Sequence, residues 1–305
     1  MAYVDAEITS QPECWRQAAE LAATFVEAMP HPGERVAVIG CGPSWFMAMA
    51  YARLREQAGH GDTDAFQTGE FPAGRHYDRV MVITRLAAAE DVVEVIQAAR
   101  QPTTVITTDP DSPAAQLATH AVALPFADER SPLPTRFATS ALALLRAGLG
   151  EQIAPIAADA EVAVRAPLPI APTRIRQATF LGRGWTIGLA HTAALTCRQA
   201  AGFRAESYPT MDFRGPLAAA APGRLVWAFG DIPDGLADTV ATSGAAFVHN
   251  RSSCVYAVLD RWAAGRQPLD PMADLILAQR FAVALAISRG LEPGSAQLSR
   301  TAMSA

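Results

Sequence analysis

Short apolar runs alternate with stretches of helical periodicity along most of the chain. The runs are rich in β-branched residues and end at Gly or polar residues, which predicts short, buried strands. In the first half we expect strands at 35–40, 80–84, 103–107 and 120–124. We expect helices there at 44–58, 88–100, 112–118 and 135–149, after an amphipathic leader helix at 12–29. Alternating elements whose strands are apolar on both faces predict a parallel sheet covered by helices, and therefore an α/β fold.

The same alternation restarts after residues 151–175, where several prolines indicate a linker. The second half is expected to hold strands at 225–229 and 245–248, helices near 234–243 and 271–288, and an apolar segment around 254–259. We therefore expect an N-terminal helix at 1–30, a first domain at 31–150, the linker, a second domain at 176–290 and a polar tail at 291–305.

Two short segments of the first half return in the second half at a constant spacing. Gly40 and Gly42 correspond to Gly182 and Gly184, each 142 positions later (182 minus 40). In another segment the corresponding residues are Phe66 and Tyr208, Thr68 and Thr210, Glu70 and Asp212, and Phe71 and Phe213, again 142 positions apart (213 minus 71). Two separate segments that keep one register predict that the halves arose by duplication.

Composition and charge limit the possible partners. Half of the 305 residues are hydrophobic and 18% are charged, the balance of a globular protein large enough for two medium domains. A formal net charge of -5 gives no basis for binding nucleic acid, which requires clustered Lys and Arg. Residues 1–10 do not resemble a signal peptide and no apolar run reaches about 18 residues, so we expect a cytoplasmic protein without membrane contact.

The segment Gly40-Cys-Gly-Pro-Ser44 joins an expected strand to an expected helix. Glycines allow a tight turn, and the first N–H groups of the helix lie at the positive end of its dipole, where an anion binds. Gly42 and Ser44 are therefore candidate binding residues, although a turn that only packs helix against strand gives the same pattern. No third glycine completes GxGxxG, so a nucleotide-dependent oxidoreductase is the least favoured function.

Other candidates lie at the ends of expected strands and helices. Thr84 and Arg85 follow a strand, at the carboxyl edge where open α/β sheets bind ligands. The guanidinium of Arg85 suits a phosphate or carboxylate, and an exposed or helix-capping arginine is the alternative. Thr135 opens a later helix and is a further candidate donor. The six histidines form no pattern with acids or serines, and Glu206 lies in one of the recurring segments, either lining a pocket or capping backbone.

The four cysteines have no apparent chemistry. They are Cys14, Cys41, Cys197 and Cys254, and they form no CxxC pair, so neither a zinc site nor a disulfide framework is expected. Packed or incidental free thiols are the default interpretation, also for Cys41, which lies at the mouth of a predicted helix.

Six motifs together resemble the SIS (sugar isomerase) family. They are Gly40-Cys-Gly-Pro-Ser44, Thr68-Gly-Glu-Phe71, Thr135-Arg-Phe-Ala-Thr139, Phe180-Leu-Gly-Arg-Gly184, Ala205-Glu-Ser-Tyr208 and Phe213-Arg-Gly-Pro-Leu217. The likeness covers about residues 31–305 and is greatest to the tandem isomerase part of glucosamine-6-phosphate synthase and to the related ketose/aldose isomerase and fructosamine deglycase branches. We expect no glutaminase domain, so this chain is not expected to supply ammonia from glutamine.

The resemblance implies two tandem flavodoxin-like SIS domains, each a parallel sheet with helices on both faces. It implies a homodimer with shared sites, a phosphorylated sugar or amino sugar as ligand, and neither a metal nor an organic cofactor. It also implies that Ser44 holds the phosphate together with a loop after the second strand. That loop reads Ser-Gln-Ser-Gly-x-Thr in the family and here occupies residues 84–89, with Arg85 in place of the Gln.

Three positions depart from the family's catalytic pattern. Its catalytic Glu aligns with Gln199, which does not act as a base at neutral pH. Its His is missing because Phe213-Arg214 runs directly into Gly215, and its C-terminal Lys corresponds to Arg300, which does not readily exchange a proton. Gln199, Arg300 and Glu206 are the candidate catalytic positions.

Two functions therefore stay open. The chain is either a divergent phosphosugar isomerase or aminosugar-phosphate deaminase or deglycase, in which surviving groups act in altered roles, or a catalytically silent phosphosugar-binding or sensor protein. The coincident departures favour the second, and the usual activity of the family favours the first.

Overall fold

A computed structural model describes residues 2–72, 74–87, 89–214, 220–249 and 268–293. These residues form two compact units. The first unit comprises Ser10–Glu129 and Arg136–Ala157, and the second comprises Met1–Thr9, Arg130–Thr135 and Ala158–Ala305. Several positions singled out in the sequence lie outside the described residues, namely 215–217, Cys254, the apolar segment 254–259 and Arg300.

The first unit is built on a five-stranded parallel sheet with the order β2-β1-β3-β4-β5. The strands are β1 (Val36–Gly40), β2 (Thr63–Gln67), β3 (Arg79–Ile83), β4 (Thr103–Thr107) and β5 (His120–Ala123). Four of them, β1, β3, β4 and β5, were expected from their apolar runs, and the first three of these are buried over their whole length. This strand order is that of flavodoxin-like folds. The α/β class and the parallel sheet are thereby confirmed.

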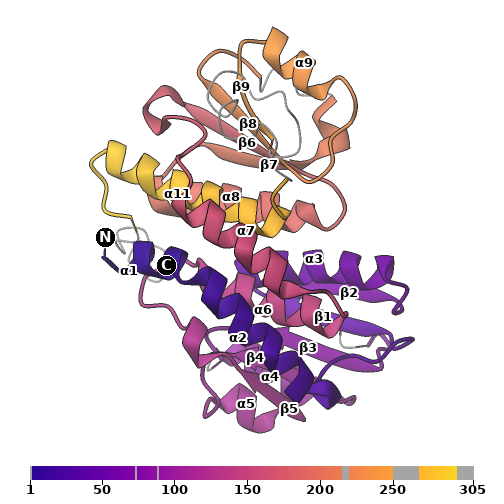
Figure 1. The fold of residues 1–305 in the computed structure, drawn as a ribbon. Helices are drawn as coiled ribbons and strands as arrows, with labels where there is room; N and C mark the ends of the chain where they lie inside the picture. The colour runs from indigo at the N-terminus through magenta and orange to yellow at the C-terminus, as the bar shows by residue number, and fades with distance from the viewer. Residues whose placement is uncertain (1, 73, 88, 215–219, 250–267, 294–305) are drawn as a thin grey trace. The chain divides into compact units, whose positions relative to one another are not determined.

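Helices cover both faces of this sheet (Figure 1). They are α2 (Gln11–Thr24), α3 (Pro43–Gln57), α4 (Glu90–Ala98), α5 (Pro113–Leu117) and α6 (Arg136–Gly148), with 3-10 turns η1 (Val26–Ala28), η2 (Thr68–Glu70) and η3 (Pro125–Ala127). Side chains of alternate strand positions, such as Ile39 and Val82, form one core with Val92 of α4 and Ala114 of α5. Helices α2, α3 and α6 pack together as the other layer. The leader helix expected at 12–29 ends at Thr24 and is preceded by α1 (Ala2–Thr9).

The second unit contains a four-stranded parallel sheet with the order β7-β6-β8-β9. Its strands are β6 (Gln177–Gly182), β7 (Ala205–Pro209), β8 (Arg224–Phe229) and β9 (Ala246–His249). The remaining elements are α7 (Ile153–Arg165), η4 (Pro172–Arg174), α8 (Thr186–Ala201), η5 (Thr210–Arg214), α9 (Leu236–Thr242) and α11 (Pro271–Ser288). The segment expected to be only a linker thus contains the helix α7.

The spacing of 142 residues recurs in the pairing of the strands. In the first sheet Gly40 of β1 lies opposite Gln67 of β2. In the second sheet Gly182 of β6 lies opposite Pro209 of β7, and both residues are 142 positions further along the chain. The two strand pairs therefore have the same length and the same register.

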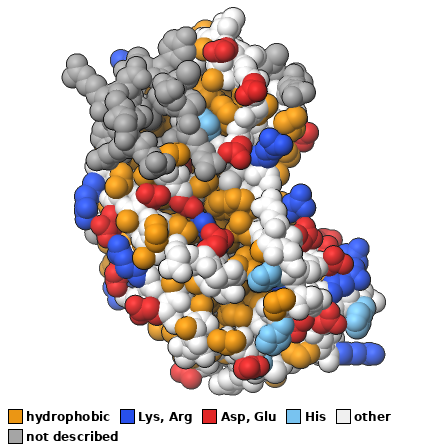
Figure 2. All heavy atoms as spheres, turned by 45° about the vertical axis from the view of Figure 1, so that its right-hand side comes forward, with side chains coloured by type: hydrophobic (Ala, Val, Ile, Leu, Met, Phe, Trp, Pro, Cys, Tyr) orange, Lys and Arg blue, Asp and Glu red, His pale blue; other side chains and the backbone are white. Residues whose placement is uncertain are grey.

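Helix α11 is the one helix among the described residues that is long and apolar enough to cross a membrane. However, 78% of this span is buried inside the structure, where α11 packs against α8 and Phe281 meets the ring of Trp227 edge to face. A core helix of a soluble protein has these properties. On the face drawn in Figure 2, Lys and Arg side chains are scattered among Asp and Glu rather than gathered into a basic patch.

Candidate functional site

The strand order of the first unit reverses between β1 and β3. These strands are neighbours, and Gly40 at the end of β1 lies opposite Ile83 at the end of β3. From this point the chain continues outward to β2 on one side and to β4 on the other. In open α/β sheets ligands bind outside the carboxyl ends of the strands at such a switch point. The loops that follow Gly40 and Ile83 are therefore the candidate site.

The turn after β1 brings the start of α3 against the end of the strand. A Cβ on Gly40 would lie 2.7 Å from the backbone carbon of Ser44 and 2.7 Å from the nitrogen of Trp45, so a side chain does not fit there. Gly42 has φ of 53° and ψ of -127°, which L side chains rarely adopt. Pro43 then begins α3 where its missing N–H costs little. Both glycines of the predicted turn are required by its geometry.

The hydroxyl of Ser44 lies in the first turn of α3. Two backbone N–H groups of this turn are hydrogen-bonded within the turn itself. Ser44 N donates to Cys41 O at 3.2 Å, and Phe46 N donates to Gly42 O at 3.1 Å. Ser44 is only 8% exposed, and its hydroxyl makes no hydrogen bond with the described residues. The oxygen is not one of the fully buried side-chain atoms that lack a partner, so it keeps some surface accessible to solvent or to a ligand.

Thr84 repeats this situation at the end of β3. Its backbone N–H donates to Ile106 O at 3.0 Å and so extends the sheet by one bond. The residue is 8% exposed, and its hydroxyl, which is also not one of the fully buried atoms without a partner, makes no hydrogen bond with the described residues. Each loop at the switch point therefore carries an accessible hydroxyl that is available to a ligand, Ser44 in the first turn of α3 and Thr84 directly after β3.

Arg85 is held by acidic residues of a distant segment. Its Nη1 donates to Glu129 O at 3.2 Å and lies 3.9 Å from Asp128 Oδ1, while its Nε lies 3.8 Å from Glu129 Oε2. The Glu129 side chain is 1% exposed, and Oε1 accepts from the backbone N–H of Arg136 at 2.6 Å. The guanidinium is therefore neither exposed nor wholly available for a phosphate.

In the corresponding turn of the second unit, the side-chain hydroxyl is hydrogen-bonded to neighbouring backbone groups. Thr186 stands 142 positions after Ser44 and begins α8. Its hydroxyl lies 2.8 Å from the donating N–H of Arg183 and 2.9 Å from the carbonyl of Phe229. The second turn therefore also has a hydroxyl group, but that hydroxyl is bonded inward.

The other predicted residues do not gather at the switch point. Thr135 is buried in the second unit, where its carbonyl accepts from Gln279 Nε2 at 3.1 Å. Gln199 is exposed near the end of α8, about 20 Å along that helix from Thr186. Glu206 is the second residue of β7 and accepts hydrogen bonds from Gln177 and Tyr208 at 3.1 and 3.0 Å. Gln199 and Glu206 thus lie away from the carboxyl edge of their own sheet.

Comparison with solved structures shows which known proteins have this fold. No protein-family model and no curated protein matches the chain. Among solved structures, the chain is 18% identical to the C-terminal domain of glucosamine-fructose-6-phosphate aminotransferase from Francisella tularensis, at a TM-score of 0.76, with 96% of this chain and 98% of that chain covered. A glucosamine-6-phosphate deaminase from Thermotoga maritima is 19% identical, at a TM-score of 0.74, with coverages of 95% and 96%.

A third structure is tagatose-6-phosphate ketose/aldose isomerase from Escherichia coli, which is 18% identical at a TM-score of 0.75, with coverages of 96% and 95%. The chain has the fold of these phosphosugar enzymes. The resemblance that the sequence motifs indicated is thereby confirmed for the fold.

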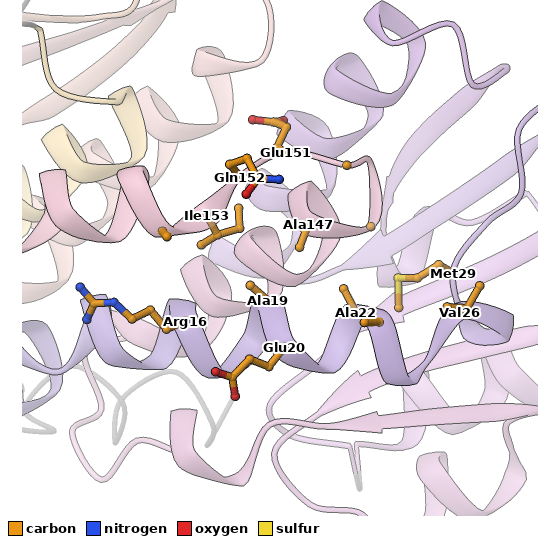
Figure 3. A pocket seen from close by; sticks show the side chains of 14 residues that line it. Arg16, Ala19, Glu20, Ala22, Val26, Met29, Ala147, Glu151, Gln152 and Ile153 are labelled. Carbon is orange, nitrogen blue, oxygen red and sulfur yellow. The ribbon is translucent and has the colours of Figure 1, made fainter.

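A hollow of about 650 Å³ lies elsewhere in the first unit, between α2 and the turn from α6 to α7 (Figure 3). Most of its lining is apolar, including Met29 and Ile153. Two of its charged groups are paired, since Arg16 lies 3.5 Å from Glu13 and Glu151 lies 2.7 Å from Arg146, whereas Glu20 has no ion pair among the described residues. The charged group left unpaired in the hollow is therefore an acid, which does not suit an anionic ligand.

One polar pair of the second unit was not predicted from the sequence. His191 Nδ1 of α8 lies 2.8 Å from Ser207 Oγ of β7. Burial, followed by the charge of Arg198, lowers the pKa of His191, so the neutral imidazole is favoured. The pair links helix to edge strand. Among the described residues, no group of three or more His, Cys, Asp or Glu could hold a metal ion.

Proposed function

We propose that this protein binds a phosphorylated sugar or amino sugar at the switch point of the first unit. The phosphate is held by the hydroxyls of Ser44 and Thr84 and by the turn that begins α3, and Arg85 supplies a further donor. The observation that carries the proposal is the pair of accessible hydroxyls at the switch point, those of Ser44 and Thr84, which make no hydrogen bond with the described residues. The enzymes with the same fold are named for glucosamine 6-phosphate and tagatose 6-phosphate, ligands of this class.

The second unit provides an internal contrast. Thr186 occupies the position of Ser44 but satisfies its hydroxyl with Arg183 and Phe229. The hydroxyl of Ser44 is accessible and makes no such bond, so it can donate to a ligand without first breaking a protein hydrogen bond. Phosphate oxygens are strong acceptors for hydroxyl groups. The anion site is therefore assigned to the first unit alone.

Replacing Ser44 by Ala, or Thr84 by Val, is expected to weaken phosphosugar binding by about 1.5 to 3 kcal/mol, because each change removes one hydrogen bond to a charged group. Titration calorimetry with glucosamine 6-phosphate and fructose 6-phosphate measures the effect. Ser140→Ala is the matched control, since Ser140 is equally buried but its hydroxyl donates to Arg136 O within α6. Equal affinity of the wild type and both site variants would refute the assignment.

Recognition is proposed to be retained while the family's proton transfer is lost. Gln199 carries an amide where a carboxylate is needed, and the carboxylate of Glu206 is engaged by Gln177 and Tyr208. Arg300, the third candidate catalytic position, is not assigned a role. The alternative, a divergent isomerase, deaminase or deglycase, is favoured by the names of the structural neighbours.

Proton exchange in heavy water separates the two functions. With fructose 6-phosphate we expect binding without deuterium incorporation at the carbon next to the carbonyl, because the described acids beside the proposed site, Asp128 and Glu129, are paired with Arg85. NMR follows the exchange over hours. Incorporation above the buffer background that disappears in Glu206→Gln would establish the enzymatic alternative instead.

The domain organisation is part of the same proposal. We infer that the two units derive from tandem SIS domains, supported by the common spacing of 142 residues and by the identical register of β1 with β2 and β6 with β7. The proposed boundaries stay at 31–150 and 176–290, with α7 in the segment between them. A homodimer in the cytoplasm, without cofactor, completes the proposal, and sedimentation equilibrium tests the dimer.

A further inference from the structure

Glu129 is a buried carboxylate that contacts both the start of α6 and the guanidinium of Arg85. It follows η3 and precedes α6 in the chain, and its side chain is 1% exposed. Oε1 accepts from the backbone N–H of Arg136, the first residue of α6, at 2.6 Å. A carboxylate at this position is stabilised by the unpaired N–H groups and the dipole of the helix. The position of the Glu129 side chain is therefore fixed by the start of α6.

The same residue holds Arg85 with both its main chain and its side chain. The carbonyl of Glu129 accepts from Arg85 Nη1 at 3.2 Å, and Oε2 lies 3.8 Å from Arg85 Nε. Nη2 of Arg85 makes no hydrogen bond or ion pair with any described residue. Nη1 thus donates a hydrogen bond to Glu129, Nε lies beyond hydrogen-bond distance of Oε2, and Nη2 keeps its donors for a ligand.

We propose that Glu129 is a positioning residue for Arg85, and the inference rests on the phosphate site proposed above. Arg85 follows Thr84 directly, so its guanidinium begins from the strand end that carries one of the two phosphate-binding hydroxyls. A free arginine would lose considerable rotamer entropy on binding a phosphate. Because Glu129 already restricts the guanidinium, less of that cost remains when the ligand binds.

Asp128 also lies beside Arg85, but we expect it to contribute less to the position of the guanidinium. Its carboxylate lies 3.9 Å from Arg85 Nη1, but its side chain is 58% exposed. An exposed ion pair at this distance contributes little in water. Asp128→Asn is therefore the matched control for Glu129→Gln, because each substitution replaces one carboxylate beside Arg85 by its amide.

A double-mutant cycle with calorimetric titration of glucosamine 6-phosphate tests the proposal. Glu129→Gln is expected to lower affinity about five- to tenfold in the wild-type background and to have no further effect in Arg85→Ala. Asp128→Asn is expected to change affinity less than about twofold. A Glu129→Gln effect that persists unchanged in Arg85→Ala, or a gain of affinity, would overturn the positioning role.

Arg85→Lys keeps the test decisive if Glu129→Gln does not fold. Lysine retains the charge but lacks the planar guanidinium, whose Nη1 and Nε lie beside Glu129. The affinity of the Arg85→Lys variant for glucosamine 6-phosphate is therefore expected to match that of Arg85→Ala. A lysine variant that binds as well as the wild type would overturn the inference. If the wild type binds no phosphosugar, or Arg85→Ala leaves binding unchanged, the proposed phosphate site itself fails in its use of Arg85.

Discussion

Replacing Asp274 by Asn is expected to stabilise the protein at pH 8, by up to about 4 kcal/mol, and to have a progressively smaller effect as the pH falls toward 4. Asp274 lies on α11 and is 2% exposed. Oδ2 accepts from Trp227 Nε1 at 3.3 Å, and Oδ1 has no hydrogen-bond partner among the described residues. Burial raises the pKa of Asp274 to about 7.

The direction of this pH dependence follows from the raised pKa. Between the ordinary carboxyl pKa of about 3.9 and the folded value, the folded state binds more protons than the unfolded state, so stability is lost as the pH rises. Above about pH 7 the full cost of a buried charge is present. Asparagine does not ionise and keeps an acceptor for Trp227, which removes the cost.

Urea unfolding of wild type and Asp274→Asn across pH 4 to 8 measures the difference. Asp238→Asn serves as the control because this acid is exposed on α9. The control is expected to change stability by less than about 0.5 kcal/mol at each pH. A stability difference that is flat with pH would contradict a titrating, buried Asp274.

Replacing Gly40 by Ala is expected to destabilise the first unit by about 3 kcal/mol and to abolish phosphosugar binding at the same time. The new Cβ would stand 2.7 Å from backbone atoms of Ser44 and Trp45, so α3 would have to move away from β1. That movement displaces the hydroxyl of Ser44. Thermal unfolding and calorimetric titration record the two effects.

Gly69→Ala is the control for this substitution, because a Cβ on Gly69 meets nothing within 4 Å. It is expected to leave both stability and binding within experimental scatter of the wild type. A Gly40→Ala protein that is as stable as Gly69→Ala would show that the turn has more room than its geometry indicates.

The sequence pattern located β5 and β9, at one edge of each sheet, but missed β2 and β7, at the other edge. The central strands are continuous apolar runs because they are covered on both faces. Strands β2 and β7, Thr-Asp-Ala-Phe-Gln and Ala-Glu-Ser-Tyr-Pro, lie at the sheet edges and are half-exposed, so no apolar run marks them. Helix α7 was hidden by Pro155, which is its third residue and is tolerated in a first helical turn.

The candidate site was predictable where it depends on local geometry. The turn at Gly42 and Ser44 and the strand end at Thr84 follow from the order of strand, glycine and helix. The role of Glu129 did not, because it lies 44 residues from Arg85 and only the tertiary fold brings the two together.

A crystal structure with glucosamine 6-phosphate tests the central claim most directly. We predict phosphate oxygens within hydrogen-bonding distance of Ser44 Oγ and Thr84 Oγ1, with Nη2 of Arg85 as a further donor. A phosphate bound instead in the hollow beside α2, or at the turn closed by Thr186, would contradict it.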